Sequence, residues 1–201
     1  MVIFPSSFRT FALTVQLLPT IQSSGTALEP SRIIHVSSML NIIGRFDVDS
    51  PDFNLEKQPF DSTKQYANTK LLLNHYNSEL ARRLECTNCE SVALHPGKQN
   101  TFIPKIVNIF YYITFSGVVS TDVYRESSPG VQQFTKRMCL LTGKNCWQGA
   151  QTTIFAAVSR EPMNGRYLSD CRDEFLLKSW SIGNSALEGR IYRLTKEKLN
   201  L

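Results

Sequence analysis

STKQYANTKLLLNHYNSELARRL, residues 62–84, predicts one long helix. Ser62 and Gln65 have the spacing of a capping box, in which two side chains satisfy backbone amides that a helix start leaves unpaired. Leucine residues supply the apolar surface, and Arg82 and Arg83 stand where the dipole of a helix favours cations. We therefore expect a rigid helix that fixes the direction of the side chains it carries.

Tyr66 and Lys70 are four residues apart, so they lie on one face of this helix, one turn apart. The pKa of a free tyrosine is about 10, which is too high for an efficient base near neutral pH. A nearby ammonium favours the phenolate and lowers that pKa, so the phenol could pass a proton to or from an alcohol or a carbonyl oxygen. The same spacing also occurs by chance on helices, and then both residues are ordinary surface residues.

Three short apolar runs are expected to be strands, near residues 32–37, 90–95 and 166–169. The first closes on Ser37-Ser38 and the second on His-Pro-Gly, and the third is expected to be the last strand of the chain. Strands that alternate with helices through long connections imply a parallel sheet with helices on both faces. Residues 39–61 are expected to form a long loop.

Taken in chain order, the serine-ended strand, the Tyr-x-x-x-Lys helix and the His-Pro-Gly strand resemble the short-chain dehydrogenase/reductase family. The resemblance is strongest to its retinol dehydrogenase-like branch and extends from about Leu13 to Cys171. The motifs that carry it are Arg82-Arg83-Leu84, His95-Pro96-Gly97, Gln148 to Thr153 and Ser169-Asp170-Cys171. It implies an α/β fold, a partial Rossmann-like doubly wound parallel sheet that corresponds to the C-terminal part of the family's fold.

The same resemblance implies the roles of three residues. Ser38, the second serine, would hydrogen-bond and polarise the reacting oxygen of the substrate. Tyr66 would be the general acid/base, and Lys70 would lower its pKa and hold the ribose hydroxyls while hydride passes to or from a nicotinamide. The alternative for Ser37 and Ser38 is that they only end a strand and open a turn.

The implied cofactor is NADP or NAD. Besides Tyr66 and Lys70, its binding residues would be Pro96, Gly97 and Thr101, which resemble the family's loop around the nicotinamide carboxamide. The implied substrate is a hydrophobic alcohol, aldehyde or ketone, retinoid-like or another lipophilic carbonyl compound.

The Gly-x-x-x-Gly-x-Gly turn of the family, which brings backbone close to the pyrophosphate, has no counterpart among the 10 glycines. The family's Asn near the start of the first helix would fall near Ser6, and residues 1–10 contain no Asn. We therefore expect one incomplete Rossmann-like domain over residues 1–201, with residues 171–201 as a polar C-terminal tail with some helix. The alternative to an oxidoreductase is a catalytically inactive, truncated remnant that acts as a binding or regulatory protein.

Two apolar segments have more than one interpretation. Residues 1–24 are expected to form a helix that ends at Pro19, rather than a short secretory signal, because no small-residue cleavage site follows. Residues 106–119 (IVNIFYYITFSGVV) are shorter than the roughly 20 apolar residues that a spanning helix needs. They could cap a hydrophobic substrate pocket, rest on a membrane surface, or form a buried helix.

The net charge of +5 is spread along the chain without a basic block, which indicates mild attraction to phosphates or anionic surfaces and no nucleic-acid binding. The small lipophilic substrate and a peripheral membrane contact are partners that the resemblance implies. Cys86 and Cys89 lack a second pair to complete a zinc site, so we expect two ordinary thiols in a reducing, intracellular compartment, cytoplasmic or peripheral to an internal membrane. His75 is expected at the surface or at its boundary, and the sequence does not determine the oligomeric state.

Overall fold

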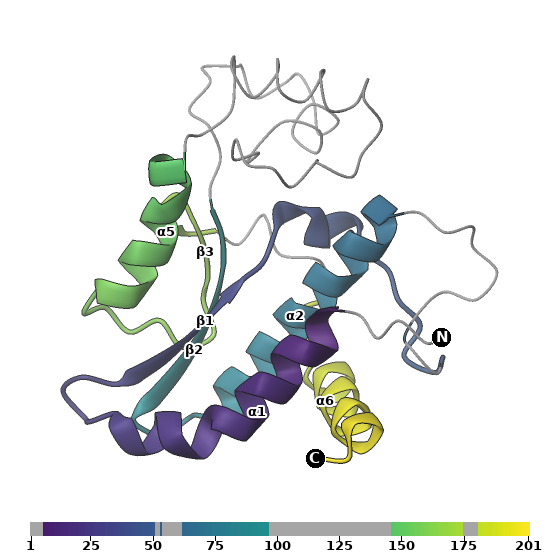
Figure 1. Cartoon of the computed structure of the whole chain (residues 1–201), viewed down its shortest axis with the longest axis horizontal. Helices are drawn as coiled ribbons and strands as arrows, with labels where there is room; N and C mark the ends of the chain where they lie inside the picture. Colours follow the sequence, from purple (N-terminus) through teal and green to yellow (C-terminus); the bar gives the residue numbers. More distant parts are fainter. Residues whose placement is uncertain (1–5, 51–52, 54–61, 97–145, 175–180) are drawn as a thin grey trace.

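The computed structural model describes residues 6–50, 53, 62–96, 146–174 and 181–201. The elements in chain order, shown in Figure 1, are α1 (Ser6–Ser24), β1 (Ser31–Val36), the 3-10 helix η1 (Met39–Ile43), α2 (Ser62–Arg83), β2 (Cys89–His95), α5 (Cys146–Val158), β3 (Tyr167–Ser169), β4 (Arg172–Asp173) and α6 (Ser185–Leu199). Helix α2 begins at Ser62, the residue at which the capping-box spacing predicts a helix start.

The sheet has the strand order β1-β2-β3-β4. β1 and β2 are parallel, with Ser31 opposite Cys89, and β2 and β3 are parallel, with His95 opposite Ser169. The three predicted strands and their parallel arrangement are therefore confirmed, and so is the α/β fold class.

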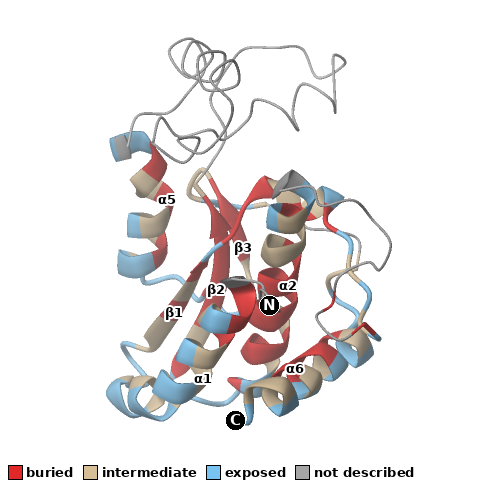
Figure 2. Ribbon diagram, turned by 45° about the vertical axis from the view of Figure 1, so that its right-hand side comes forward, coloured by how far each residue is buried: buried red, intermediate tan, exposed pale blue. Residues whose placement is uncertain are grey.

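Helices cover both faces of the sheet. α1, α2 and α6 lie on one side and α5 lies on the other (Figure 1). Ile33 of β1 packs with Leu80 and Leu84 on the α2 side, whereas Val92 and Leu94 of β2 pack against Ala156 of α5. Figure 2 shows this burial as a layer running through the strands and the inner face of α2. A sheet buried on both faces is the usual environment of parallel strands.

Helix α1 continues through Pro19 to Ser24, so the prediction that it ends at Pro19 was wrong. A proline inside a helix costs about 3 kcal/mol, because it lacks an amide and its ring crowds the carbonyl four residues earlier. Leu18 and Ile21, on either side of Pro19, both pack against the cluster that contains Ile33. Both side chains are only partly buried, so their packing offsets a part of the cost of the proline.

The segment predicted as a long loop begins with η1. The side chain of Ser38 caps this helix and accepts a hydrogen bond from the amide of Leu40. Gly44, which follows η1, comes so close to α2 that a Cβ atom there would lie 2.7 Å from the carbonyl oxygen of Ala67. The first part of the segment is thus fixed against α2.

The strand predicted to be the last one is followed by β4, so that prediction was wrong. Asp170 and Cys171 both have positive φ angles, 51° and 58°, and β4 returns antiparallel to β3. Positive φ at both central residues is the geometry of a tight two-residue hairpin, which usually contains Asn or Gly. Asp170-Cys171 gives no such signal in the sequence.

The helix expected in the C-terminal segment is α6. Asn184 caps its start, Asn200 ends it in a left-handed conformation, and Ile191 and Tyr192 are buried against α1 and α2. This part of the chain therefore belongs to the core rather than to a polar tail. The apolar segment 106–119 lies outside the described residues.

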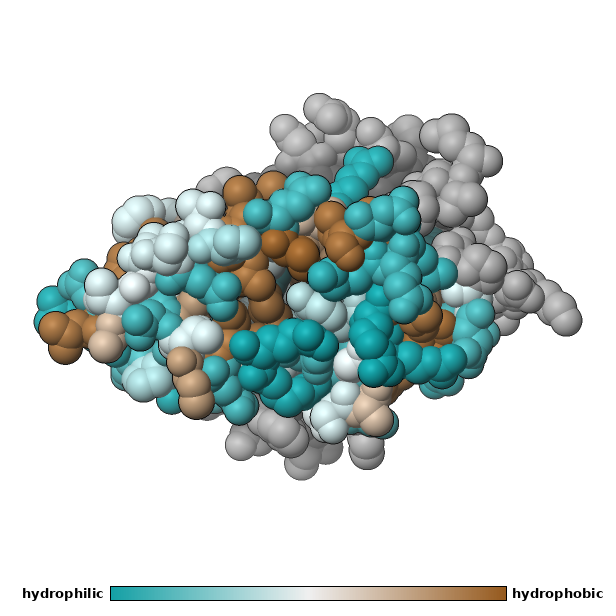
Figure 3. Space-filling model, turned by 90° about the horizontal axis from the view of Figure 1, so that it is seen from below, coloured by the Kyte–Doolittle hydropathy of each residue, from teal (hydrophilic) through white to brown (hydrophobic). Residues whose placement is uncertain are grey.

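The surface is hydrophobic in places. α1 exposes Leu13 and Leu17, and Figure 3 shows hydrophobic side chains gathered in the middle of the face seen from below. No helix in the described part of the chain is long and apolar enough to cross a membrane.

Candidate active site

The site is built where the carboxyl end of β1 meets the first turns of α2. The amide of Ser37 donates a hydrogen bond of 2.7 Å to Leu94 of β2, so the turn after β1 stays attached to the sheet. Ser38 then caps η1, and η1 packs against α2. Because both α2 and the sheet are rigid, the side chains of Ser38 and α2 face each other in a fixed geometry.

The structure brings the three predicted catalytic residues together. The hydroxyl of Ser38 lies close enough to the phenol of Tyr66 to lower the Tyr66 pKa. The ammonium of Lys70 lies 5.4 Å from the centre of the Tyr66 ring and donates a hydrogen bond of 2.8 Å to the carbonyl of Val36. Ser38 is buried and Tyr66 is 43% exposed, so the phenol can be reached from solvent.

Of the predicted cofactor loop, only the beginning can be located. Pro96 follows the last residue of β2 and lies at the same edge of the parallel sheet as Ser38. Open α/β sheets bind their ligands at the carboxyl ends of their strands, which is this edge. Gly97 and Thr101 lie outside the described residues.

Burial raises the pKa of Tyr66 above its ordinary value, and the hydrogen bond from Ser38 works against this increase without offsetting it. The expectation that Lys70 lowers this pKa was therefore wrong for the structure as it stands. The physical reason is the position of the ammonium, which lies against the ring and the Val36 carbonyl. Burial also lowers the pKa of Lys70. Tyr66 is consequently a neutral phenol, which can donate a proton to a carbonyl oxygen.

No sequence motif indicates the buried polar residues next to Ser38, which are Ser37, Asn41 and Tyr167. The amide of Asn41 donates a hydrogen bond of 3.3 Å to the hydroxyl of Tyr167, and Ser37 lies beside that hydroxyl. Asn41 and Tyr167 are 126 residues apart in the chain, so no local motif connects them. The adjacent Ser-Ser pair was the only available signal, and it does not distinguish the roles of the two serines.

His75 is fully buried, so its predicted place at the surface was wrong. Its Nε2 lies 3.1 Å from the hydroxyl of Ser181, and its Nδ1 lies 3.6 Å from Oε1 of Glu188. Glu188 also accepts a hydrogen bond from the amide of Gly183 and pairs with Arg82 at 2.6 Å. A serine, a histidine and a carboxylate occur together in hydrolases, but here the carboxylate is occupied by groups that tie α6 to α2. We interpret the cluster as structural.

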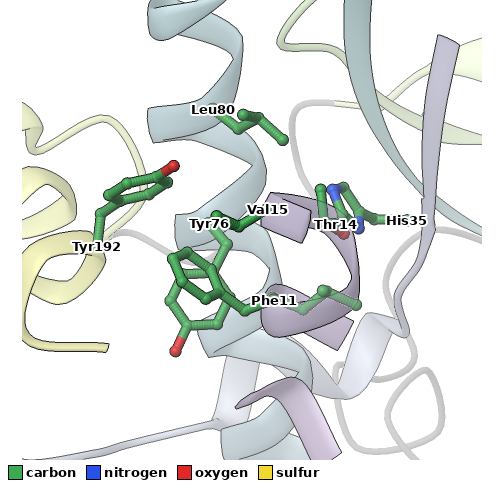
Figure 4. A pocket seen from close by; sticks show the side chains of 8 residues that line it. Phe11, Thr14, Val15, His35, Tyr76, Leu80 and Tyr192 are labelled. Carbon is green, nitrogen blue, oxygen red and sulfur yellow. The ribbon is translucent and has the colours of Figure 1, made fainter. Parts of the chain in front are cut away.

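A small cavity lies between α1, α2, α6 and β1 (Figure 4). Among its lining residues are Phe11, Val15, His35, Tyr76 and Tyr192. Burial lowers the pKa of His35 to about 4, so the ring is neutral. The cavity volume is about 10 Å³, which is room for roughly one water molecule, so it cannot hold a substrate.

Within the described ranges, no group of three His, Cys, Asp or Glu residues could hold a metal ion. Cys86 is an exposed free thiol and Cys89 a buried one, and burial raises the pKa of Cys89. The described side chains that meet at the site carry a hydroxyl (Ser38), a phenol (Tyr66) and an ammonium group (Lys70).

Comparison with known proteins shows clear relatives, although no protein-family model matches the chain. Human "Retinol dehydrogenase 14" is 34% identical over 175 residues, which cover 83% of this chain and 43% of that protein. Human "Retinol dehydrogenase 12" is 28% identical over 199 residues, 95% of this chain and 51% of that protein. "Dehydrogenase/reductase SDR family member 13" from Bos taurus is 29% identical over 170 residues, 82% of this chain and 38% of that protein.

The chain thus spans about half the length, or less, of these relatives. Among solved structures, an uncharacterized protein from Mycobacterium paratuberculosis superimposes with a TM-score of 0.57. It is 20% identical, and the match covers 96% of this chain and 56% of the other. At that identity, the likeness concerns the fold alone.

Proposed function

Because the chain belongs to the short-chain dehydrogenase/reductase family, we propose that it acts as an oxidoreductase on a hydrophobic alcohol, aldehyde or ketone. The observation that carries this proposal is the meeting of three side chains: the hydroxyl of Ser38 lies beside the phenol of Tyr66, and the ammonium of Lys70 lies beside the Tyr66 ring. A hydroxyl, a phenol and an ammonium group placed side by side can move a proton to and from the oxygen of a substrate.

In the direction of reduction, the neutral phenol of Tyr66 gives its proton to the carbonyl oxygen of the substrate. The hydroxyl of Ser38 donates a second hydrogen bond to that oxygen and polarises the carbonyl group. The phenolate left on Tyr66 lies beside the Lys70 ammonium, whose nitrogen is 5.4 Å from the centre of the ring. It is then protonated again from solvent, which reaches this half-exposed side chain. In the direction of oxidation the same proton moves in reverse.

A nicotinamide cofactor, NADP or NAD, supplies or accepts the hydride when it is bound. The donors at this edge of the sheet fit the nicotinamide ribose. Lys70 uses one of its three N–H donors on the Val36 carbonyl, which leaves two for ribose hydroxyls. We assign Tyr66, Lys70, Pro96, Gly97 and Thr101 to this half of the cofactor.

The substrate class we propose is lipophilic and retinoid-like. Its support is the name retinol dehydrogenase, which two of the relatives bear. The apolar segment 106–119 would cap the substrate pocket or rest on a membrane surface. The corresponding location is intracellular, in the cytoplasm or peripherally on an internal membrane.

A second candidate is an inactive remnant that works as a binding or regulatory protein. One observation on these 201 residues favours it: no two glycines are closer than six residues, so the sequence contains no Gly-x-x-x-Gly-x-Gly turn. Such a protein would keep the fold and the Ser38–Tyr66 contact without turning over substrate.

The deciding experiment measures oxidation of NADPH and NADH by the purified chain at millimolar cofactor, with retinal and long-chain aliphatic aldehydes as substrates. The matched control is Tyr66→Phe, which keeps the ring and removes the proton donor. Loss of a positioned acid/base lowers turnover by about 10²–10⁴-fold. Turnover that survives Tyr66→Phe would refute the mechanism. If neither protein turns over any aldehyde, the remnant is the better description of this chain.

A further inference from the structure

The carboxyl end of β1 carries two serines, and only the second one faces Tyr66. Next to the turn after β1 lies a buried layer of three polar side chains. They are Ser37, Asn41 and Tyr167, with exposed fractions of 3%, 0% and 0%. They come from three different elements: the turn after β1, the helix η1, and the strand β3. Burying three polar side chains is unfavourable unless their hydrogen bonds are made, so their partners matter.

The side-chain amide of Asn41 supplies two hydrogen bonds. One goes to the main-chain carbonyl of Ser38 at 2.8 Å, and the other goes to the hydroxyl of Tyr167 at 3.3 Å. Both N–H donors of this amide are thereby used. Asn41 therefore ties the backbone of Ser38 to a side chain that belongs to β3.

The buried layer continues from Tyr167 to Ser37. The Tyr167 hydroxyl, which accepts from Asn41, also lies beside the hydroxyl of Ser37, and this neighbour lowers the Tyr167 pKa. The hydroxyl of Ser37 in turn donates to the main-chain carbonyl of Lys70 at 3.4 Å. The network thus begins at the backbone of Ser38 and ends at the backbone of Lys70, so it braces two residues of the proposed site against each other.

We propose that Asn41, Tyr167 and Ser37 are positioning residues that hold the Ser38 hydroxyl against Tyr66. This inference rests on the proposed function. Ser37 anchors the turn while Ser38 contacts the substrate oxygen, which gives each serine of the pair its own role. Burial raises the pKa of Tyr167, so it stays a neutral hydroxyl that can accept and donate at the same time.

The test measures how strongly Ser38 acts on Tyr66, and it does not require the protein to turn over a substrate. Tyr66 ionisation is followed by ultraviolet absorbance, as the difference between each protein and the same protein carrying Tyr66→Phe. The measured quantity is the Tyr66 midpoint, the pH at which half of Tyr66 is ionised. Ser38→Ala removes a neighbour that lowers the Tyr66 pKa, so this midpoint rises. We expect Asn41→Ala and Tyr167→Phe to raise the midpoint as well, because they release the turn that holds Ser38.

A double-mutant cycle shows whether the two positions act through Ser38. In the Ser38→Ala background, Asn41→Ala and Tyr167→Phe should produce no further shift, because the contact they support is already lost. The matched control is Tyr76→Phe, which removes another buried hydroxyl, hydrogen-bonded to Thr195 at 2.8 Å. It should lower the thermal stability as Tyr167→Phe does and leave the Tyr66 midpoint where it was.

If Asn41→Ala and Tyr167→Phe lower stability but leave the midpoint unchanged, they are merely structural and the proposal is overturned. It is equally overturned if their shifts persist in the Ser38→Ala background. Turnover provides the second readout: a misplaced catalytic group lowers it by about 10²-fold, with little change in KM. If Asn41→Ala and Tyr167→Phe shift the Tyr66 midpoint but the protein turns over no substrate, the positioning role stands and only the proposed activity is rejected.

Discussion

The Lys70 ammonium donates a hydrogen bond of 2.8 Å to the main-chain carbonyl of Val36, at the last residue of β1. This bond holds the side chain along the sheet edge, where its nitrogen lies 5.4 Å from the centre of the Tyr66 ring. A cation over the face of an aromatic ring is attracted by the ring as a whole, and not by the phenol oxygen alone. The position therefore explains why Lys70 is close to Tyr66 without lowering its pKa in this structure.

Substitutions of Lys70 test whether the ammonium has to be compact. Lys70→Ala should lower turnover because it removes both the cation and the hydrogen bond to Val36. Lys70→Arg keeps the charge, but a planar guanidinium presents its donors in a different geometry, so we expect activity to fall here too. The measurement is turnover in a chimera that joins this chain to the glycine-rich, nucleotide-binding strands of a full-length relative. Full activity in Lys70→Arg would show that charge alone suffices.

Cofactor affinity is the second prediction. A dinucleotide is anchored mainly through its pyrophosphate, and the 201-residue sequence contains no Gly-x-x-x-Gly-x-Gly turn to hold it. The hydrogen bonds from Tyr66 and Lys70 to the ribose must also offset the entropy lost on association. We therefore expect no binding of NADP or NAD at micromolar concentration in a calorimetric titration. A full-length family member titrated alongside is the positive control, and micromolar affinity of this chain would contradict the prediction.

The third prediction concerns the buried carboxylate of Glu188. Burial works to raise its pKa, but the nearby His75 ring, the amide of Gly183 and the guanidinium of Arg82 together outweigh burial and hold the pKa below its ordinary value of 4.5. Removing one partner of a buried ion pair costs about 3–5 kcal/mol, and Glu188→Gln removes the charge that faces Arg82. Arg82 is partly exposed. We therefore expect Glu188→Gln to lower the free energy of unfolding by about 3 kcal/mol, the lower end of that range, as measured by urea unfolding at neutral pH.

The sign of the pH dependence follows from the lowered pKa. The contribution of the Glu188 carboxylate is complete above the pKa of the unfolded chain and is lost as the pH falls through the folded pKa. The difference in stability between wild type and Glu188→Gln should therefore shrink on acidification. Glu161→Gln is the control, since Glu161 is largely exposed and pairs with Arg166 at 3.6 Å, an arrangement worth about 0–1 kcal/mol. A pH-independent difference would show that Glu188 acts through packing and not through charge.

Local patterns predicted the elements of this fold well. The strand before Ser37-Ser38 is rich in isoleucine and valine, the strand that ends at His95 is short and largely apolar, and the helix between them has a clear start and end. Spacing alone also placed Tyr66 and Lys70 on one face. These features depend on neighbouring residues, so a single sequence contains them.

What could not be predicted depends on contacts between distant residues. Tyr167 meets Asn41 across 126 positions of the chain, and His75 is buried because Ser181 and Glu188 reach it from the C-terminal segment. Pro19 stays inside a helix because of the packing of its neighbours on the sheet. Such contacts form only when the elements pack together, so the periodicity of the sequence does not predict them.

Gly44 provides the last prediction, because it sets how closely η1 can approach α2. Its φ of −61° suits any residue, so only space limits a substitution. An added Cβ would lie 2.7 Å from the carbonyl oxygen of Ala67 and 2.9 Å from Cβ of Leu71, and a backbone atom in a rigid helix cannot move aside cheaply. We expect Gly44→Ala to cost about 1–3 kcal/mol, the usual effect of overpacking.

The matched control for Gly44→Ala is Gly189→Ala, in the helix α6. A Cβ there would meet only the carboxylate of Glu79, at 3.8 Å, so nothing has to move. Alanine is favoured over glycine inside a helix by about 0.5–1 kcal/mol, so this variant should be more stable than wild type. Both are measured by chemical unfolding followed by circular dichroism. Because η1 carries Ser38 at its start, Gly44→Ala should also raise the Tyr66 midpoint, and a variant as stable as wild type would show that η1 is free to shift along α2.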